Sequence, residues 1–198
     1  QQVVQLQADD DPDTVWVRPE AIEAERLARG EIGTVNAKIT DAEGNRVGYE
    51  RLLKYFRTAF GGDVIHPSVI QKIVMVPKPD GSPGKQDSMP HWCGIFSWWA
   101  LKTAGVPLPD WKIGMSILKF VEPRPPGTLP QKGDIAYRSK NDHFALVSGV
   151  ESLATAAGKP VKDVKVRTIN GNTAGADNLG GQVQERWDPI SAWLTFFD

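Results

Sequence analysis

Cysteine is almost absent from this chain of 198 residues, which has a single one, Cys93. One cysteine cannot form an internal disulfide, so a small secreted fold held together by disulfides is excluded. A cysteine-rich zinc site is excluded for the same reason. Cys93 is then a buried inert thiol, a reactive thiol or a lone metal ligand, and its surroundings must decide between these.

An excess of charge of one sign and a long apolar run are lacking as well. Lys and Arg number 23 against 24 Asp and Glu, a formal net charge of −1, which argues against a nucleic-acid-binding protein because such proteins are usually basic. The most apolar helical stretch, residues 92–101, has ten residues where a membrane helix needs about 18, so we expect no membrane span. The chain begins with Gln and shows no signal peptide, which suggests a piece of a longer polypeptide.

The order of the predicted elements indicates an α+β fold. Residues 1–40 are predicted to be an acidic N-terminal extension or linker with a short helix, and residues 41–198 a single catalytic domain. Apolar spacing and glycine stops predict helices first, over 21–29, 49–60, 92–104 and, more briefly, 115–121. Short β-branched or alternating segments then predict antiparallel strands over 134–137, 144–150, 164–169 and 182–187.

Cys93 lies where a loop rich in proline and glycine, residues 77–90, becomes the 92–104 helix. Amides at a helix start have no intrahelical acceptor, and the helix dipole places partial positive charge there. Both effects favour a thiolate, and the Cys93 N–H could also bind an oxyanion. Within the helix, apolar spacing predicts one buried face that carries Trp92, Phe96 and Trp99, with Trp98 off that face.

A nucleophilic thiol needs a base, and the chain has three histidines. His91 is two residues from Cys93, where side chains do not share a helix face, and His66 has no matching polar partner nearby in the sequence. His143 opens a predicted strand after a polar turn, so we choose it as the base. Its neighbour Asp142 either raises the pKa of His143 or faces solvent.

An imidazole base also needs an acceptor on its second nitrogen. The strand that ends at residues 168–172 (TINGN) brings Asn170 near the start of the His143 strand if the two strands pair as antiparallel neighbours. Asn170 would then orient His143; the alternative is that Asn-Gly-Asn only makes a turn.

Four segments in this order resemble the motifs of the NlpC/CHAP-type cysteine peptidases and amidases: residues 92–96 (WCGIF), 132–137 (KGDIAY), 143–147 (HFALV) and 169–172 (INGN). The resemblance covers about residues 86–187, roughly half of the chain. It implies a papain-like core in which the nucleophile helix packs on a small antiparallel sheet. It also implies that Cys93 is the nucleophile, His143 the base and Asn170 the orienting residue, without a metal or cofactor. The family usually has Gly before this His, where this chain has Asp142.

The same resemblance implies a substrate and a location. The substrate is an amide bond of bacterial cell-wall peptidoglycan, and the protein acts outside the cell or in the periplasm, secreted or delivered. Predicted substrate-binding residues are Gln86, which is either an oxyanion donor or a plain loop residue, and Trp92, Trp98 and Asn172. Two alternatives remain open: a toxin or effector domain of this fold that cleaves or deamidates a protein, and an inactive binding module with a packed Cys93. A metal site formed by His91, Cys93 and His143 is a further alternative.

Overall fold

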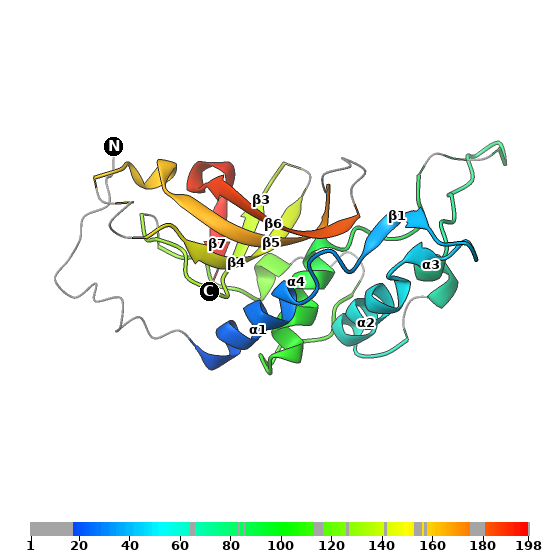
Figure 1. Ribbon diagram of the computed structural model, residues 1–198, viewed down its shortest axis with the longest axis horizontal. Coiled ribbons are helices and arrows are strands. Elements are labelled where there is room, and N and C mark those ends of the chain that lie inside the picture. The colour runs from blue at the N-terminus through cyan, green and yellow to red at the C-terminus, as the bar shows by residue number, and fades with distance from the viewer. Residues whose placement is uncertain are drawn as a thin grey trace.

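One antiparallel sheet, with a layer of helices on one of its faces, makes up the fold (Figure 1). The fold is that of a computed structural model. The residues that the structure describes are 18–63, 66–82, 84, 86–112, 117–125, 127–140, 142–152, 156, 158–174 and 181–197. The strands run in the order β2-β1-β6-β5-β4-β3-β7, and every neighbouring pair is antiparallel. This confirms the predicted α+β class.

The helices and strands have the following bounds. The helices are α1 (Pro19–Arg29), α2 (Tyr49–Phe60), α3 (Pro67–Gln71) and α4 (Cys93–Thr103), with the short 3-10 helices η1 (Ile117–Lys119), η2 (Val161–Asp163) and η3 (Ile190–Ala192). The strands are β1 (Asn36–Thr40), β2 (Arg46–Val47), β3 (Ile135–Arg138), β4 (His143–Val150), β5 (Lys165–Thr173), β6 (Gln182–Pro189) and β7 (Thr195–Phe197). Among the described residues no helix is both long and apolar enough to cross a membrane.

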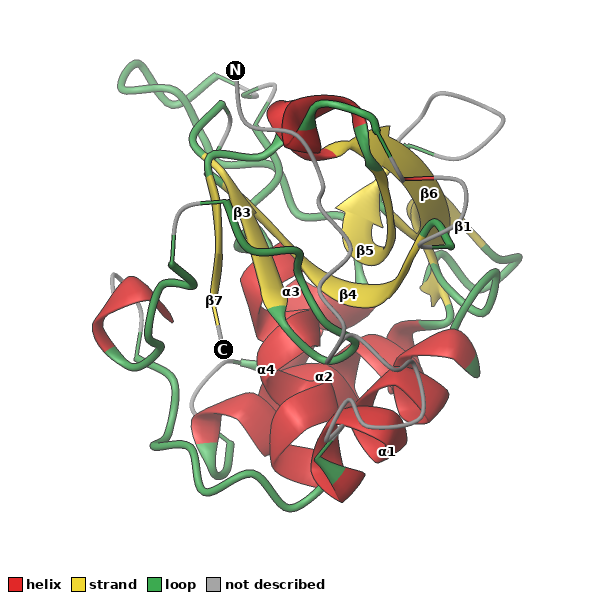
Figure 2. Ribbon diagram, turned by 90° about the vertical axis from the view of Figure 1, so that its left-hand side faces the viewer, coloured by secondary structure: helices red, strands yellow, loops and turns green. Residues whose placement is uncertain are grey.

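Helix α4 lies at the centre of the molecule, between the sheet and helices α1 and α2 (Figures 1 and 2). All residues from Cys93 to Leu101 are buried, so the prediction of a single apolar face was wrong, because α4 is covered on every side. Tyr55 of α2 packs against Phe96 and Trp99, with ring centroids 5.3 and 4.6 Å away. The apolar core of the protein is thus built around the helix that carries the cysteine.

Two glycines let α4 approach the sheet closely. A Cβ atom on Gly171 of β5 would lie 2.6 Å from Cβ of Phe96, and one on Gly94 would lie 3.4 Å from the Phe144 ring of β4 and 2.9 Å from the Trp111 ring. A larger residue at Gly171 would push α4 away from β5, and one at Gly94 would also displace Trp111. The glycines of the WCGIF and INGN segments therefore have a packing role that fixes the start of α4 against β4 and β5.

Residues 19–40 belong to the same sheet and helical layer as the rest of the described chain. Helix α1 packs against α4, and β1 pairs with both β2 and β6. The predicted boundary at residue 40 therefore falls inside the β1–β2 hairpin. The acidic residues up to position 17, including Trp16, lie outside the described residues.

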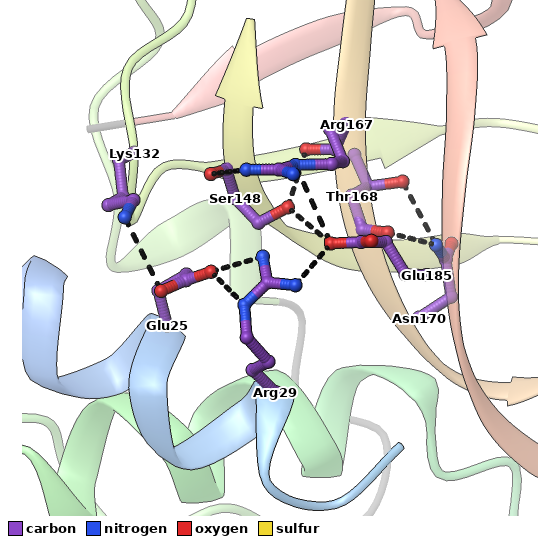
Figure 3. A network of polar contacts seen from close by, with 8 residues as sticks. All are labelled: Glu25, Arg29, Lys132, Ser148, Arg167, Thr168, Asn170 and Glu185. Atoms are coloured by element: carbon purple, nitrogen blue, oxygen red, sulfur yellow. Dashed lines mark hydrogen bonds and ion pairs between the residues drawn. The ribbon is translucent and has the colours of Figure 1, made fainter. Parts of the chain in front are cut away.

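An ion-pair network ties α1 to the sheet (Figure 3). The Arg29 guanidinium donates to Glu25 at 2.7 Å and also pairs with Glu185 of β6 at 2.8 Å. Lys132, in the loop before β3, reaches Glu25 at 3.4 Å. Helix α1 is thereby fixed by ion pairs through the buried Glu25 as well as by its contact with α4.

Candidate active site

A cleft of about 790 Å³ opens where the start of α4 meets the start of β4. Its lining includes Cys93 and His143, together with Gln86, Trp92 and Asn172. The fold thus places five of the seven residues predicted for the site on one cleft. Asn170 lies directly behind His143, and Trp98 lies elsewhere.

Cys93 is the first residue of α4, and its sulfur lies at the beginning of β4. The thiol donates a long hydrogen bond, 3.8 Å, to the carbonyl oxygen of Asp142, the residue before His143. Burial raises the pKa of the Cys93 thiol, although the backbone N–H groups of Phe144 and Gly94 act in the opposite direction. The expected depression of this pKa at the helix start is therefore outweighed by burial, and the resting group is a thiol.

His143 and Asn170 are brought together by the pairing of β4 with β5. Leu146 is opposite Ile169, which places Ala145 opposite Asn170 and His143 two residues further on the same face. The His143 Nε2 atom lies 2.9 Å from Oδ1 of Asn170. His143, the first residue of β4, thus meets Asn170, the sixth residue of β5, whose side-chain oxygen accepts its hydrogen bond.

The buried Asn170 amide has a fixed orientation, which defines the tautomer of His143. Its Nδ2 donates to the carbonyl oxygen and to Oγ1 of Thr168, at 3.2 and 2.9 Å (Figure 3). Its oxygen is therefore the atom that faces the imidazole. Nε2 of His143 must then carry the hydrogen and donate it. Nδ1 is left with a lone pair that can accept a proton.

Burial lowers the pKa of His143, while the hydrogen bond to Asn170 opposes this and the positive charge of Arg138 adds to it. The imidazole is therefore neutral at neutral pH, the form in which a general base works. Asp142 does not raise this pKa above its ordinary value; its carboxylate is engaged with the Tyr137 side chain, whose pKa it raises through a hydrogen bond.

Trp193, between η3 and β7, supports the His143 ring, and sequence analysis did not identify it. The two ring centroids are 6.2 Å apart, with the planes inclined by 30°. Trp193 is 5% exposed and packs in an apolar cluster that includes Ala145 of β4 and Phe196 of β7. Because it follows His143 by 50 residues in the sequence, no local pattern connects the two.

The loop of residues 86–92 forms the opposite wall of the cleft and is anchored by an ion pair between the buried Arg46 and the half-buried Asp87. The Arg46 guanidinium, which is 0% exposed, donates to both oxygens of Asp87 at 2.6 and 2.9 Å, and also to the Ala37 carbonyl at 2.6 Å. Burial opposes ionisation of Asp87, but the bonds from Arg46 and from the Met89 N–H prevail and lower its pKa. This bidentate pair holds the loop against the β1–β2 hairpin.

The predicted substrate-binding residues divide into two groups. Gln86 and Asn172 line the cleft, and the buried Trp92 contributes to its floor. Trp98 was wrongly predicted to line the cleft. It is 0% exposed, donates its indole N–H to the Pro109 carbonyl at 2.8 Å and packs edge-on against Trp111, because α4 is buried on the face that carries it.

The other two histidines do not take part in the pair. His91 lines the cleft but is exposed, with Nδ1 3.4 Å from Nδ2 of Asn172. His66 bonds to Ser68 at the start of α3. Across the described part of the chain, no group of three or more His, Cys, Asp or Glu side chains is arranged to hold a metal ion.

The arrangement contains the groups needed for acyl transfer through a thioester. Cys93 and His143 line one cleft, Asn170 bonds to the His143 ring, and the Cys93 N–H at the start of α4 has no helical acceptor. No protein-family model, curated protein or solved structure gives a significant match to the chain.

Proposed function

We propose that this protein is a papain-like cysteine amidase or endopeptidase that hydrolyses peptide amide bonds of bacterial peptidoglycan, outside the cell or in the periplasm. The observation that carries the proposal is the hydrogen bond of 2.9 Å between His143 Nε2 and Asn170 Oδ1, beside a cleft that both His143 and Cys93 line. The wall substrate follows from the resemblance of the four motifs to wall hydrolases.

In the proposed reaction, Nδ1 of His143 takes the Sγ proton of Cys93 as the sulfur attacks the amide carbon. The carbonyl oxygen becomes an oxyanion, which accepts a hydrogen bond from the Cys93 N–H. The resulting imidazolium donates its proton to the departing amine. Water, deprotonated by His143, then hydrolyses the thioester and restores the thiol.

The neutral resting forms of Cys93 and His143 are compatible with this order of events. Burial disfavours the charged form of each group, so the proton moves when the substrate is in place. Asn170 keeps the Nε2 hydrogen and the ring plane fixed while Nδ1 gains and loses its proton. The site therefore needs no preformed ion pair.

The test uses purified cell walls. The wild-type protein should reduce their turbidity and release new amino groups, which report amide cleavage, without new reducing sugar ends. Cys93→Ala should lose at least about 10³-fold in rate, whereas His66→Ala, which alters an exposed histidine outside the cleft, should match the wild type. Equal rates for wild type and Cys93→Ala would refute the proposal. An active thiol without wall cleavage would favour a protein substrate instead.

A further inference from the structure

Arg138 is a cationic side chain of the cleft to which neither the fold nor the proposed reaction assigns a role. It is the last residue of β3 and lies directly opposite His143 in the β3–β4 pair. It lines the cleft together with Cys93 and His143. Its positive charge is close enough to contribute to the lowered pKa of His143. Arg138 is therefore adjacent to the reacting groups.

Several arginines of the protein are paired with a carboxylate, whereas Arg138 contacts an aromatic ring. Arg46 is paired with Asp87, Arg124 with Asp134 and Arg29 with Glu25. No carboxylate within the described ranges lies within ion-pair distance of Arg138. Its guanidinium instead lies over the Trp193 ring, 5.0 Å from the ring centroid. A half-buried cation beside a polar cleft is thus left without a counterion from these residues.

The contact with Trp193 holds the guanidinium over the indole ring. A guanidinium that lies over an aromatic ring can still donate hydrogen bonds through its N–H groups. Trp193 also contacts the His143 ring, so one rigid side chain positions both the base and the cation. This is the preorganisation expected of a site for a planar anion, because a guanidinium and a carboxylate form two parallel hydrogen bonds.

We propose that Arg138 binds a carboxylate of the substrate beside the scissile amide, and that the enzyme therefore acts on acidic peptides. The inference rests on the proposed function and specifies its substrate class. Lys38, another cation of the cleft, is on β1, on the far side of β6 and β5 from β4, and already lies 3.5 Å from Asp87. The anion is therefore recognised on the β3 side of Cys93.

Two reagents that alkylate thiols test this contact without knowledge of the natural substrate. Iodoacetate and iodoacetamide differ in one group, a carboxylate in place of an amide. The folded wild type should show an iodoacetate-to-iodoacetamide rate ratio at Cys93 about tenfold or more above that of the unfolded chain, since a charged hydrogen bond contributes about 1.5–3 kcal/mol. Arg138→Met should return this ratio to the unfolded value, and Arg138→Lys should give an intermediate ratio.

Arg186→Met is the matched control. Arg186 also acts electrostatically on His143, but it does not line the cleft. If Arg186→Met and Arg138→Met lower the iodoacetate-to-iodoacetamide rate ratio equally, the effect is only the long-range electrostatic potential of the positive charges, and the proposal is overturned. A wild-type ratio equal to that of the unfolded chain would overturn it as well. Failure of both reagents to modify folded Cys93 would overturn the proposed function itself, and the inference with it. Circular dichroism of each variant confirms that it is folded.

The source of the carboxylate is resolved by two further substrate pairs. Wall stem peptides with free or amidated carboxyl groups form one pair, and linear L-peptides with Glu or Gln beside the scissile bond form the other. A preference of tenfold or more for the free carboxylate in either pair, abolished by Arg138→Met, supports the proposal and identifies the source. Cleavage of the neutral member of both pairs at the rate of the acidic member would contradict it.

Discussion

The two walls of the cleft are held in place by different means. On the sheet wall, formed by β4 and β5, His143 and Asn170 are fixed by strand pairing and by a chain of neutral hydrogen bonds that ends at Thr168. On the loop wall, residues 86–92, the chain is fixed by the Arg46–Asp87 ion pair. The first wall carries the proposed chemistry, and the second sets the shape of the space above Cys93.

This difference shows how each wall should fail. A substitution in the sheet wall should leave the pairing of β4 with β5 unchanged and affect only His143, the proposed proton acceptor. A change in the ion pair leaves a buried charge without its partner, which costs stability as well as position.

The largest effect is expected when the loop wall is broken. Asp87→Asn should lower the free energy of unfolding by about 3–5 kcal/mol, because the fully buried Arg46 loses its countercharge. Urea denaturation measures the change. Asp63→Asn is the control, since Asp63 pairs with Arg57 at an exposed site and should contribute less than about 1 kcal/mol. Equal losses in the two variants would contradict the anchoring role of Asp87.

The second prediction breaks the sheet wall. Asn170→Leu keeps the branched arrangement of heavy atoms but removes the acceptor for His143 Nε2, so kcat should fall about 10²-fold through misorientation of the ring. Asn170→Asp keeps an acceptor oxygen and should recover most of this loss. The kinetics of peptide-amide hydrolysis measure both variants. If Asn170→Leu and Asn170→Asp are equally impaired, the hydrogen bond does not orient the base.

The third prediction concerns the core beneath both walls. Trp98→Phe removes the indole hydrogen bond to the Pro109 carbonyl, and thermal denaturation should show a loss of about 1–2 kcal/mol. Because Trp98 lies outside the cleft and does not contact the substrate in this account, KM should change less than about twofold. A large rise in KM with unchanged stability would instead place Trp98 at the substrate.

The smallest expected effect is a shift of the acid limb of the pH–rate profile. The reaction needs neutral His143, whose pKa burial holds below its ordinary value of 6.5, so activity should persist below pH 6.5 and fall at lower pH. Protonation also favours the unfolded chain, where the pKa is higher, so stability decreases as pH falls below 6.5. An acid limb centred above pH 6.5 would contradict the assigned environment.

The sequence predicted those parts of the fold that depend on local patterns. The 49–60 helix has its predicted bounds, and the 92–104 helix differs by one residue at each end, because apolar spacing and a following glycine are local signals. The strands that carry His143 and Asn170 were predicted for the same reason. Strands β1, β2 and β7 were missed, because β1 is mostly exposed and β2 and β7 have only two and three residues, so none shows an alternating apolar pattern.

The supporting groups of the site could not be predicted. Arg46 and Asp87 are 41 residues apart, and Trp193 reaches His143 only through the closure of the sheet by β7. Trp98 was misplaced because periodicity identifies which residues share a face but does not reveal that a helix is covered on every face. Sequence spacing thus indicated the groups that we propose to react, and tertiary packing determined what holds them.

The most direct test of the central claim, that His143 activates Cys93, is the rate at which Cys93 is acylated by p-nitrophenyl acetate at pH 7. The wild type should release one nitrophenolate per chain in a burst, and His143→Ala should slow the burst about 10²-fold or more. His66→Ala should leave it at the wild-type rate. Equal bursts in wild type and His143→Ala, or a loss found only in His91→Ala, would contradict the account.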